Sequence, residues 1–433
     1  MTDETLILGA GMTGLAVGSA SGLPVLEAEQ SAGGICLSYY MRPGEDEPLP
    51  HRPPDGEAYR FENGGGHWIF GGDPAVIQFI RRSAPVQSYV RRSSVFFPDS
   101  GIYVPYPIQN HLRHLAPNLA ARALNEMAHP AGPFETMEEW LRESFGPTLA
   151  DMFFVPFHDL YTAGLSKRIA PQDAYKSPVN LSLVVQGALQ DSPPVGYNTK
   201  FLYPVEGLNL LATRLAEKCK VQYGRRVVAI DAGNKSLRFA DGSAQGYGQL
   251  ISTLPLSQVM EMSDLSTEFR ADPHTSVLVL NIGARKGPRC PLDHWIYVPH
   301  SKGRFHRVGF YSNVDASFLP LSARRERSHV CIYVEKAFLP QDRPTPQAVA
   351  AYSGQVVAEL QGWGFIGEVD VVHPTWVEVA YTWSWPESRW KQEALGILEQ
   401  AEIYQVGRYG RWIFQGIADS IRDGFIAGSS FRE

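Results

Sequence analysis

Short apolar segments and glycine-rich turns alternate at the start of the chain. Residues 5–8 are apolar and lead into Gly9-Ala10-Gly11-Met12-Thr13-Gly14, and a second apolar segment, residues 23–26, ends on an acid. This pattern predicts a strand, a tight turn that opens a helix, and a second strand with an acid at its tip. The combination is typical of a dinucleotide-binding unit.

Each glycine in this turn has a predicted task. Gly9 permits the tight turn, Gly11 lets the backbone approach a pyrophosphate, and Gly14 lets the helix pack closely on the sheet. The helix N-terminus at Met12 and Thr13 is expected to offer free N–H groups and partial positive charge to the phosphates.

The residues after the second strand indicate which dinucleotide binds. Glu27 is placed to accept hydrogen bonds from a ribose, and its charge would repel the 2′-phosphate of NADP. The pair Gly33-Gly34 follows closely. An acid followed by a second glycine loop favours FAD over NAD, with Gly34 beside the phosphates of the flavin.

Beyond the first 73 residues the hydrophobic pattern changes twice. Residues 74–177 show helical periodicity, for example at 119–124 and 137–141, and predict an inserted helical domain. Later segments alternate between short strands and single helices. Strands are expected at 201–204, 221–249, 250–253, 276–282, 295–298, 307–311, 330–334 and 371–381, and helices at 209–219, 345–363 and 418–427.

These elements predict an α/β fold with a discontinuous Rossmann-like FAD-binding domain, an inserted helical domain and a mostly antiparallel β-sheet substrate domain. The FAD-binding domain is expected to be assembled from residues 1–73, 179–265 and 395–433. The helical insertion, expected at 74–178, and the antiparallel sheet, expected at 266–394, would bind substrate.

Bulk composition narrows the function classes. The chain has 433 residues and a net charge of -6, so no excess of basic residues indicates a nucleic-acid partner. Its four cysteines lack CxxC spacing, which predicts neither a zinc site nor a disulfide framework. No apolar run reaches the length of a membrane span. We expect a cytoplasmic enzyme without a metal.

Two loops carry candidate ligand-binding side chains. His67 follows three consecutive glycines, Gly64 to Gly66, which allow backbone to lie against a flat ring. Tyr106 and Gln109 lie in a proline-stiffened loop, where an aromatic face and an amide suit a nucleotide base. The alternatives are a structural histidine and an ordinary Pro-Tyr-Pro turn.

Three arginines have unusual neighbours. Arg168 follows the last helix of the predicted helical domain, Arg307 lies inside an apolar strand, and Arg408 lies within a Gly-Arg-Tyr-Gly motif. A buried arginine needs a bidentate partner, which is either a diphosphate or a protein carboxylate. Aromatic residues are dense near Trp295, Tyr297 and Tyr381, where they suit either a sugar site or a core.

Together these pieces resemble the UDP-galactopyranose mutase family, particularly its eukaryotic branch, within the FAD-dependent amine oxidase and protoporphyrinogen oxidase superfamily. The resemblance covers nearly the whole chain. It rests on the GxGxxG start, Gly65-Gly66-His67, Val104-Pro105-Tyr106-Pro107-Ile108-Gln109-Asn110, Lys167-Arg168-Ile169-Ala170-Pro171, Phe201-Leu202-Tyr203-Pro204, Leu250-Ile251-Ser252-Thr253, Trp295-Ile296-Tyr297, Phe305-His306-Arg307 and Gly407-Arg408-Tyr409-Gly410-Arg411-Trp412.

The resemblance implies a ring contraction of a nucleotide sugar, most simply a UDP-hexose. In that reaction N5 of reduced FAD attacks the anomeric carbon and the diphosphate leaves and returns. An external reductant such as NAD(P)H would prepare the flavin. The residues carried over as catalytic are His67, Arg168 and Arg307. Cofactor contacts carried over include Gly66, Val227, Gly407, Arg408 and Ser420, and substrate contacts are Tyr106, Gln109, Phe157, Trp295, Tyr297 and Tyr381.

The chain departs from the family pattern near the sugar. His158 follows Pro156-Phe157 where the family tends to have asparagine, and Phe414 stands where a tyrosine contacts the diphosphate. These departures bear on the identity of the substrate more than on the flavin. The alternatives are an oxidase or desaturase of the amine oxidase type, which needs no diphosphate clamp, and a flavin scaffold without catalysis.

Overall fold

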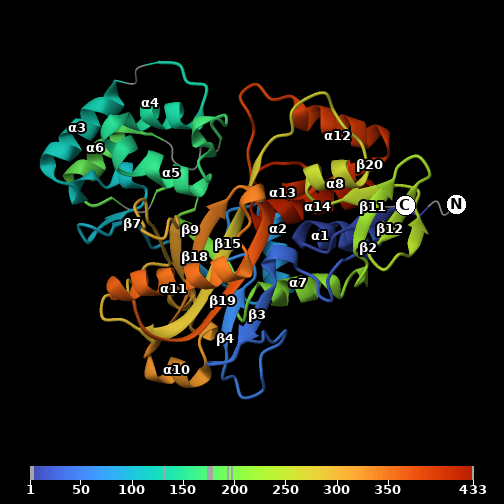
Figure 1. The fold of residues 1–433 in the computed structure, drawn as a ribbon, viewed down its shortest axis with the longest axis horizontal. Coiled ribbons are helices and arrows are strands. Elements are labelled where there is room, and N and C mark those ends of the chain that lie inside the picture. The colour runs from blue at the N-terminus through green and yellow to red at the C-terminus, as the bar shows by residue number, and fades with distance from the viewer. Residues whose placement is uncertain (1–3, 130–131, 173–178, 193–194, 197, 432–433) are drawn as a thin grey trace.

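The computed structural model describes residues 4–129, 132–172, 179–192, 195–196 and 198–431. The nucleotide end, the antiparallel sheet and a group of helices follow one another along the long axis (Figure 1). The helices are α1 (Met12–Ser21), α2 (Pro74–Ser83), α3 (Pro117–Ala128), α4 (Met137–Leu149), α5 (Val155–Tyr161), α6 (Leu181–Leu189), α7 (Leu208–Ala216), α8 (Leu256–Met262), α9 (Tyr311–Val314), α10 (Leu321–Glu326), α11 (Pro346–Gly362), α12 (Trp390–Gln400), α13 (Gly407–Gly410) and α14 (Ile417–Ser430).

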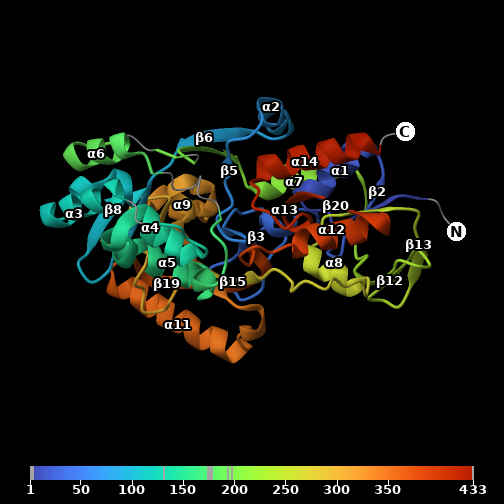
Figure 2. The ribbon, with the colours of Figure 1, turned by 90° about the horizontal axis from the view of Figure 1, so that it is seen from above.

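The nucleotide end is a parallel five-stranded sheet drawn from distant parts of the chain. Its order is β10 (Lys220–Gln222), β2 (Pro24–Leu26), β1 (Leu6–Leu8), β14 (Leu250–Ser252) and β20 (Ile403–Gln405). The predicted discontinuous α/β domain is therefore confirmed. Helices α1 and α14 lie side by side against it (Figures 1 and 2). Their backbones touch at Gly424, where a Cβ would lie 2.4 Å from the carbonyl oxygen of Thr13.

A mostly antiparallel seven-stranded sheet forms the middle of the molecule. Its order is β19 (Ile366–Thr382), β15 (His274–Lys286), β18 (His329–Phe338), β17 (Arg307–Phe310), β16 (Trp295–Tyr297), β7 (Ser93–Phe97) and β8 (Ile102–Pro105). Only the β16–β7 pair is parallel among these described strands. Helix α11 packs on one face, and the other face turns toward the cavity described below.

Three small sheets complete the described strands. They are the hairpin β3 (Ser38–Met41) and β4 (Tyr59–Glu62), the sheet β5 (Ile69–Phe70), β9 (Lys200–Pro204) and β6 (Val86–Val90), and the sheet β11 (Val227–Asp231), β12 (Ser236–Phe239) and β13 (Ala244–Gly246).

The structure differs from the expected helical insertion in two places. Strands β6, β7 and β8 interrupt residues 74–178, because the apolar runs of β7 and β8 are needed as the edge of the seven-stranded sheet. Helix α6, expected in the FAD-binding part, packs instead with α3. Helix α6 also packs closely on the turn Ile108–Asn110 through Gly187, since a Cβ there would lie 1.8 Å from the carbonyl oxygen of Asn110.

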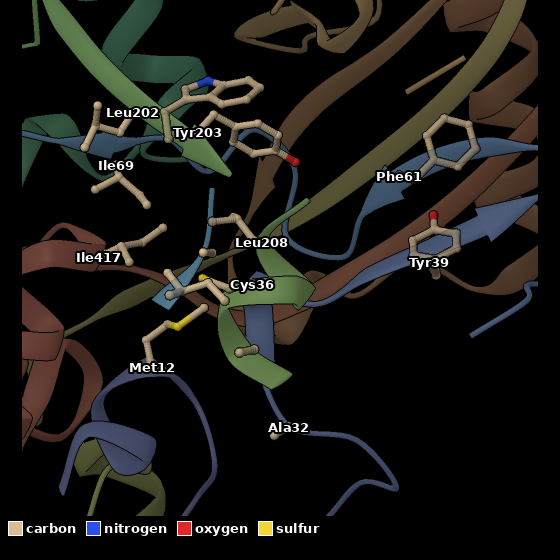
Figure 3. Close-up of a cluster of buried hydrophobic side chains, with 14 of the residues drawn as sticks. Met12, Ala32, Cys36, Tyr39, Phe61, Ile69, Leu202, Tyr203, Leu208 and Ile417 are labelled. Carbon is tan, nitrogen blue, oxygen red and sulfur yellow. The ribbon is translucent and has the colours of Figure 1, made fainter. Parts of the chain in front are cut away.

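A large hydrophobic core joins the nucleotide sheet to the antiparallel sheet. Figure 3 shows part of it, with Met12 at the start of α1, Cys36 and Leu208 around one space. Met12 and Cys36 also line the cavity, so residues of the core that joins the two sheets form part of the cavity wall. Within the described part of the chain, every helix is too short or too polar to cross a bilayer.

Candidate active site

One continuous cavity of about 660 Å³ runs from the parallel sheet to the helices of the insertion. Gly11 and Thr13 line its nucleotide end, and Tyr106, Phe157 and Tyr297 line its far end. The cavity therefore joins the predicted cofactor site to the predicted substrate site. The residues that line the cavity come from several segments of the chain, which are described in turn below.

The turn after β1 has the geometry that a pyrophosphate requires. Gly9 has φ +94° and Gly14 lies so close that a Cβ on it would be 1.9 Å from the Gly9 carbonyl oxygen. At Gly11, by contrast, the position of a Cβ is open space. Helix α1 begins there without a side-chain cap or an acidic first turn, so its free N–H groups and positive end face the cavity.

Glu27 is fixed beside this turn. Its carboxylate accepts hydrogen bonds from the N–H of Ala10 at 2.6 Å and from the N–H of Glu29 at 2.9 Å. The side chain is buried and lines the cavity, where its remaining lone pairs can accept from a ribose. Gly34 lies against the first loop, since a Cβ on it would be 3.6 Å from the Cα of Gly11.

The C-terminal motif closes the nucleotide end from another side. Gly407 has φ +79°, and a Cβ there would be 2.4 Å from Oγ1 of Thr13. Asp423 on α14 accepts a hydrogen bond from the Gly407 N–H at 3.1 Å. Arg408, Ser420 and Val227, expected at the cofactor, line the cavity. The guanidinium of Arg408 donates to the carbonyls of Gln415 and Ala380, at 3.0 and 3.1 Å.

The glycines before His67 leave room for neighbouring protein side chains, whereas the sequence led us to expect that they leave room for a flat ring. A Cβ on Gly66 would lie 2.0 Å from the hydroxyl of Tyr333, and one on Gly65 would lie 2.8 Å from Oε1 of Glu335. The glycines therefore admit protein side chains, while Gly66 and His67 still line the cavity. Burial lowers the pKa of His67 to about 4, so the imidazole is neutral at neutral pH.

Arg307 and Glu335 form a close ion pair in the wall of the cavity. Nε and Nη2 of Arg307 donate to Oε2 of Glu335 at 2.9 and 2.5 Å, across the β17–β18 pair. Burial alone would raise the pKa of Glu335, but Arg307 and His306 outweigh it and bring the pKa to about 2. Burial would likewise lower the pKa of Arg307, yet the Glu335 carboxylate holds it well above the usual value. Both groups are charged at neutral pH.

Aromatic side chains enclose the far end of the cavity. Tyr106 and Tyr297 have ring centroids 4.7 Å apart, and Phe157 meets Tyr297 edge-on at 5.2 Å. Trp295 is buried in the same wall. The hydroxyl of Tyr381 accepts a 3.4 Å hydrogen bond from Arg307, which ties the aromatic wall to the ion pair.

The structure brings most of the predicted site residues together. His158 and Phe414 also line the cavity, and the Phe414 ring lies under the guanidinium of Arg408 with a separation of 4.7 Å. Gln109 and Arg168 do not join the described lining. Gln109 is fully buried in a short helical turn because the loop folds inward there, and Arg168 is exposed at a separate surface hollow.

Sequence reasoning missed Glu335 and His306 as site residues. His306 is fully buried, lines the cavity and faces Glu335, with Nε2 3.4 Å from Oε2. A signal existed, because Glu335 is a carboxylate at the end of the apolar run 330–334. The alternative of a protein carboxylate for Arg307 is the one that the structure shows. The sequence alone did not show that β17 and β18 pair, which is what brings Glu335 opposite Arg307.

Comparison with known proteins places these features in a family. Residues 23–279 match the family described as flavin containing amine oxidoreductase. A structure of reduced UDP-galactopyranose mutase is similar with a TM-score of 0.83 at 21% identity, covering 99% of this chain and 95% of that one.

Two further solved structures share the fold. A putative protoporphyrinogen oxidase from Exiguobacterium sp. 255-15 has a TM-score of 0.71 at 14% identity, covering 99% of both chains. A putrescine oxidase variant has a TM-score of 0.57 at 13% identity, covering 99% of this chain and 98% of that one.

The family implies FAD, and the residues present fit it. The open space at Gly11, the uncapped start of α1 and the fixed carboxylate of Glu27 match a pyrophosphate and a ribose. Among the described residues, no group of three or more His, Cys, Asp or Glu side chains is arranged to hold a metal. On the match over more than half of its length, this chain belongs to the flavin containing amine oxidoreductase family.

Proposed function

We propose that this flavoenzyme is a nucleotide-sugar mutase that interconverts the pyranose and furanose forms of a UDP-hexose. The observation that carries the proposal is the Arg307 guanidinium in an aromatic chamber continuous with the cofactor cradle. An apolar amine carries no anionic group that a fixed guanidinium, here also hydrogen-bonded to Tyr381, could bind. The overall similarity to a UDP-galactopyranose mutase over 99% of the chain supports the same choice.

The Arg307–Glu335 pair leaves donors for a substrate. Glu335 occupies Nε and Nη2 of Arg307, and no described protein group accepts from Nη1. A guanidinium held on one edge presents its other edge in a fixed direction, which suits a diphosphate. Arg307 would therefore hold the diphosphate while charge develops on it during bond cleavage.

The aromatic wall supplies the other contacts. Tyr106 and Tyr297 would hold the uracil between an aromatic face and a phenol edge. Phe157, His158 and Trp295 would line the sugar and exclude water from it. Bound FAD in its reduced form would supply the nucleophile for the anomeric carbon. His67, neutral because of its lowered pKa, would lie beside the sugar as a hydrogen-bonding group and add no charge.

A second candidate function, an FAD-dependent oxidase, is favoured by the family match itself. An oxidase would consume an acceptor and form peroxide in step with substrate. A mutase has no net redox change, so it would turn over many times after one reduction of the flavin. This difference separates the two functions without reference to substrate fit.

The test is an anaerobic incubation of dithionite-reduced protein with UDP-galactopyranose and a panel of UDP-, GDP- and dTDP-hexoses. We expect a furanose isomer of one UDP-hexose, resolved by HPLC, and no product from the oxidised protein. NAD(P)H should replace dithionite as reductant. Equal turnover in air without a reductant, or stoichiometric peroxide, would contradict the mutase and support the oxidase.

A further inference from the structure

A second hollow lies on the surface beside the start of α12, outside the cavity. It encloses about 380 Å³ and is lined by three arginines, Arg168, Arg270 and Arg389, together with the rings of Phe269 and Trp385. The three arginines come from three separate segments of the chain. All three are exposed, so their donors are accessible to a ligand from solution.

The hollow carries a net positive charge. Glu387 is the only carboxylate in its described lining. Arg389 also pairs with Glu393 at 3.1 Å, so these two carboxylates offset part of the charge of the three guanidinium groups. Three guanidinium groups around one concave space raise the local potential and attract an anion.

Two of the guanidinium groups are held in place by aromatic rings. Arg270 lies over Trp385 at 3.7 Å, and Arg389 lies over Phe269 at 5.2 Å. Trp385 is itself fixed, because its indole N–H donates to the Ala271 carbonyl at 2.8 Å and its backbone N–H donates to Asp272 at 3.0 Å. A stacked guanidinium keeps its in-plane N–H donors free for a ligand.

The backbone near Arg168 is also anchored at this hollow. The N–H of Ala170 donates to the carbonyl of Ser384 at 2.8 Å, which joins the segment after α5 to the segment after β19. The 11-residue helix α12 begins at Trp390, next to Arg389.

We propose that this hollow is a second anion site, which binds a ligand with two linked phosphoryl groups. Guanidinium forks match phosphoryl oxygens bidentately, and guanidinium groups from three separate segments can contact both phosphoryl groups of one ligand. The ligand is a free pyrophosphate or the diphosphate part of a nucleotide. The site is independent of the catalytic function proposed above, because none of its residues lines the cavity.

The test is calorimetric titration of the FAD-loaded full chain with inorganic pyrophosphate at low salt. The Arg307→Gln variant serves as background, because it removes the diphosphate contact expected in the cavity. In that background we expect one pyrophosphate to bind. Adding Arg270→Gln with Arg389→Gln should weaken binding at least about tenfold.

A charge-matched control is the background with Arg214→Gln and Arg343→Gln. These arginines are exposed and ion-paired, and Arg343 also lies over a tryptophan, but neither lines the hollow. Binding in the control should stay within about twofold of the background. An equal loss in the control, or unchanged binding after Arg270→Gln with Arg389→Gln, would overturn the site.

Competing ligands identify the source of the diphosphate. UDP that binds as tightly as pyrophosphate would support recognition of the diphosphate alone, and tighter binding of UDP or NADPH would support a nucleotide ligand. Inorganic phosphate that binds as tightly as pyrophosphate would overturn the requirement for two phosphoryl groups. None of these measurements depends on turnover, so a failed mutase assay leaves them interpretable.

Discussion

The two ends of the cavity are built from different parts of the polypeptide. At the nucleotide end the decisive features are backbone features, such as the φ of Gly9 and the free N–H groups of α1. At the far end they are side chains, such as the Arg307–Glu335 pair and the neighbouring rings of Tyr106 and Tyr297. A site made by backbone groups is encoded by consecutive residues of the sequence. A site made by side chains depends on which strands become neighbours in the folded sheet.

The sharpest test of this contrast compares Gly14→Ala with Gly11→Ala. A Cβ at Gly14 would meet the Gly9 carbonyl at 1.9 Å, whereas a Cβ at Gly11 has open space. Gly14→Ala should destabilise the fold by about 3 kcal/mol or more. Gly11→Ala should keep its thermal midpoint without cofactor but lose bound flavin, because the added methyl occupies the path of the pyrophosphate.

The measurements for these two variants are the ratio of flavin to protein absorbance and the melting curve of the flavin-free protein. Full flavin retention by Gly11→Ala would show that the open space at Gly11 is not where the phosphates lie.

The side-chain end is tested by Arg307→Ala. Loss of a charge-assisted contact to the leaving diphosphate should lower kcat by about two to three orders of magnitude while flavin content stays normal. Arg307→Lys should recover part of the activity, because a point charge cannot reproduce the planar fork.

Arg343→Ala, which removes an exposed arginine paired with Glu378, is the control and should leave kcat unchanged. Wild-type affinity for the nucleotide sugar in Arg307→Ala, measured by calorimetry, would remove the diphosphate contact from the mechanism.

Lowering the pH should reduce the free energy of unfolding before it protonates Glu335 of the Arg307–Glu335 pair. Burial lowers the pKa of His67, His111 and His294 to about 4, below the ordinary value of 6.5. The unfolded chain therefore binds more protons between pH 6.5 and 4, and the free energy of unfolding should fall as the pH falls through that window. The stabilisation from Glu335 is fully present above its ordinary pKa of 4.5 and is lost progressively as the pH falls from there to about 2.

Urea unfolding at several pH values measures this dependence. A free energy of unfolding that stays constant from pH 6.5 to 4.5 would contradict neutral, buried imidazoles.

The smallest expected effect concerns Phe414→Tyr. The resemblance to the UDP-galactopyranose mutase family places a tyrosine at this position, and Phe414 lines the cavity next to Arg408. A restored hydroxyl should improve binding of the nucleotide sugar by about 1 kcal/mol, or roughly fivefold. The same change at Phe425, which packs on Phe79 away from the cavity, should leave binding unchanged. Equal affinity in Phe414→Tyr would show that the diphosphate does not reach this wall.

The nucleotide end of the cavity was easier to predict from the sequence than the far end. The turn at Gly9 to Gly14, the acid Glu27 and the three-part nucleotide sheet could be predicted, because each depends on local patterns or on one strand returning to a sheet. Strands β7 and β8 were mistaken for part of a helical segment, since β7 joins the sheet through β16, about two hundred positions away along the chain, and β8 joins it through β7.

The partner of Arg307 was missed for a similar reason. Glu335 faces it only through the register of β17 on β18, which no local pattern reveals. Arg168 and Gln109 were carried over from family motifs, and neither side chain belongs to the described lining of the cavity in this structure.

The position of β20 and α14 late in the chain has a consequence for biosynthesis. When a ribosome has released residues up to Ser252, four of the five strands of the nucleotide sheet have been made, but β14 still lacks its neighbour β20. Arg408 and Ser420 emerge only after the whole antiparallel sheet. Flavin capture is thus a late event in folding, and a nascent chain that stops early keeps an open sheet edge that invites aggregation and degradation. A yellow colour of the purified protein would therefore report complete synthesis as well as a bound cofactor.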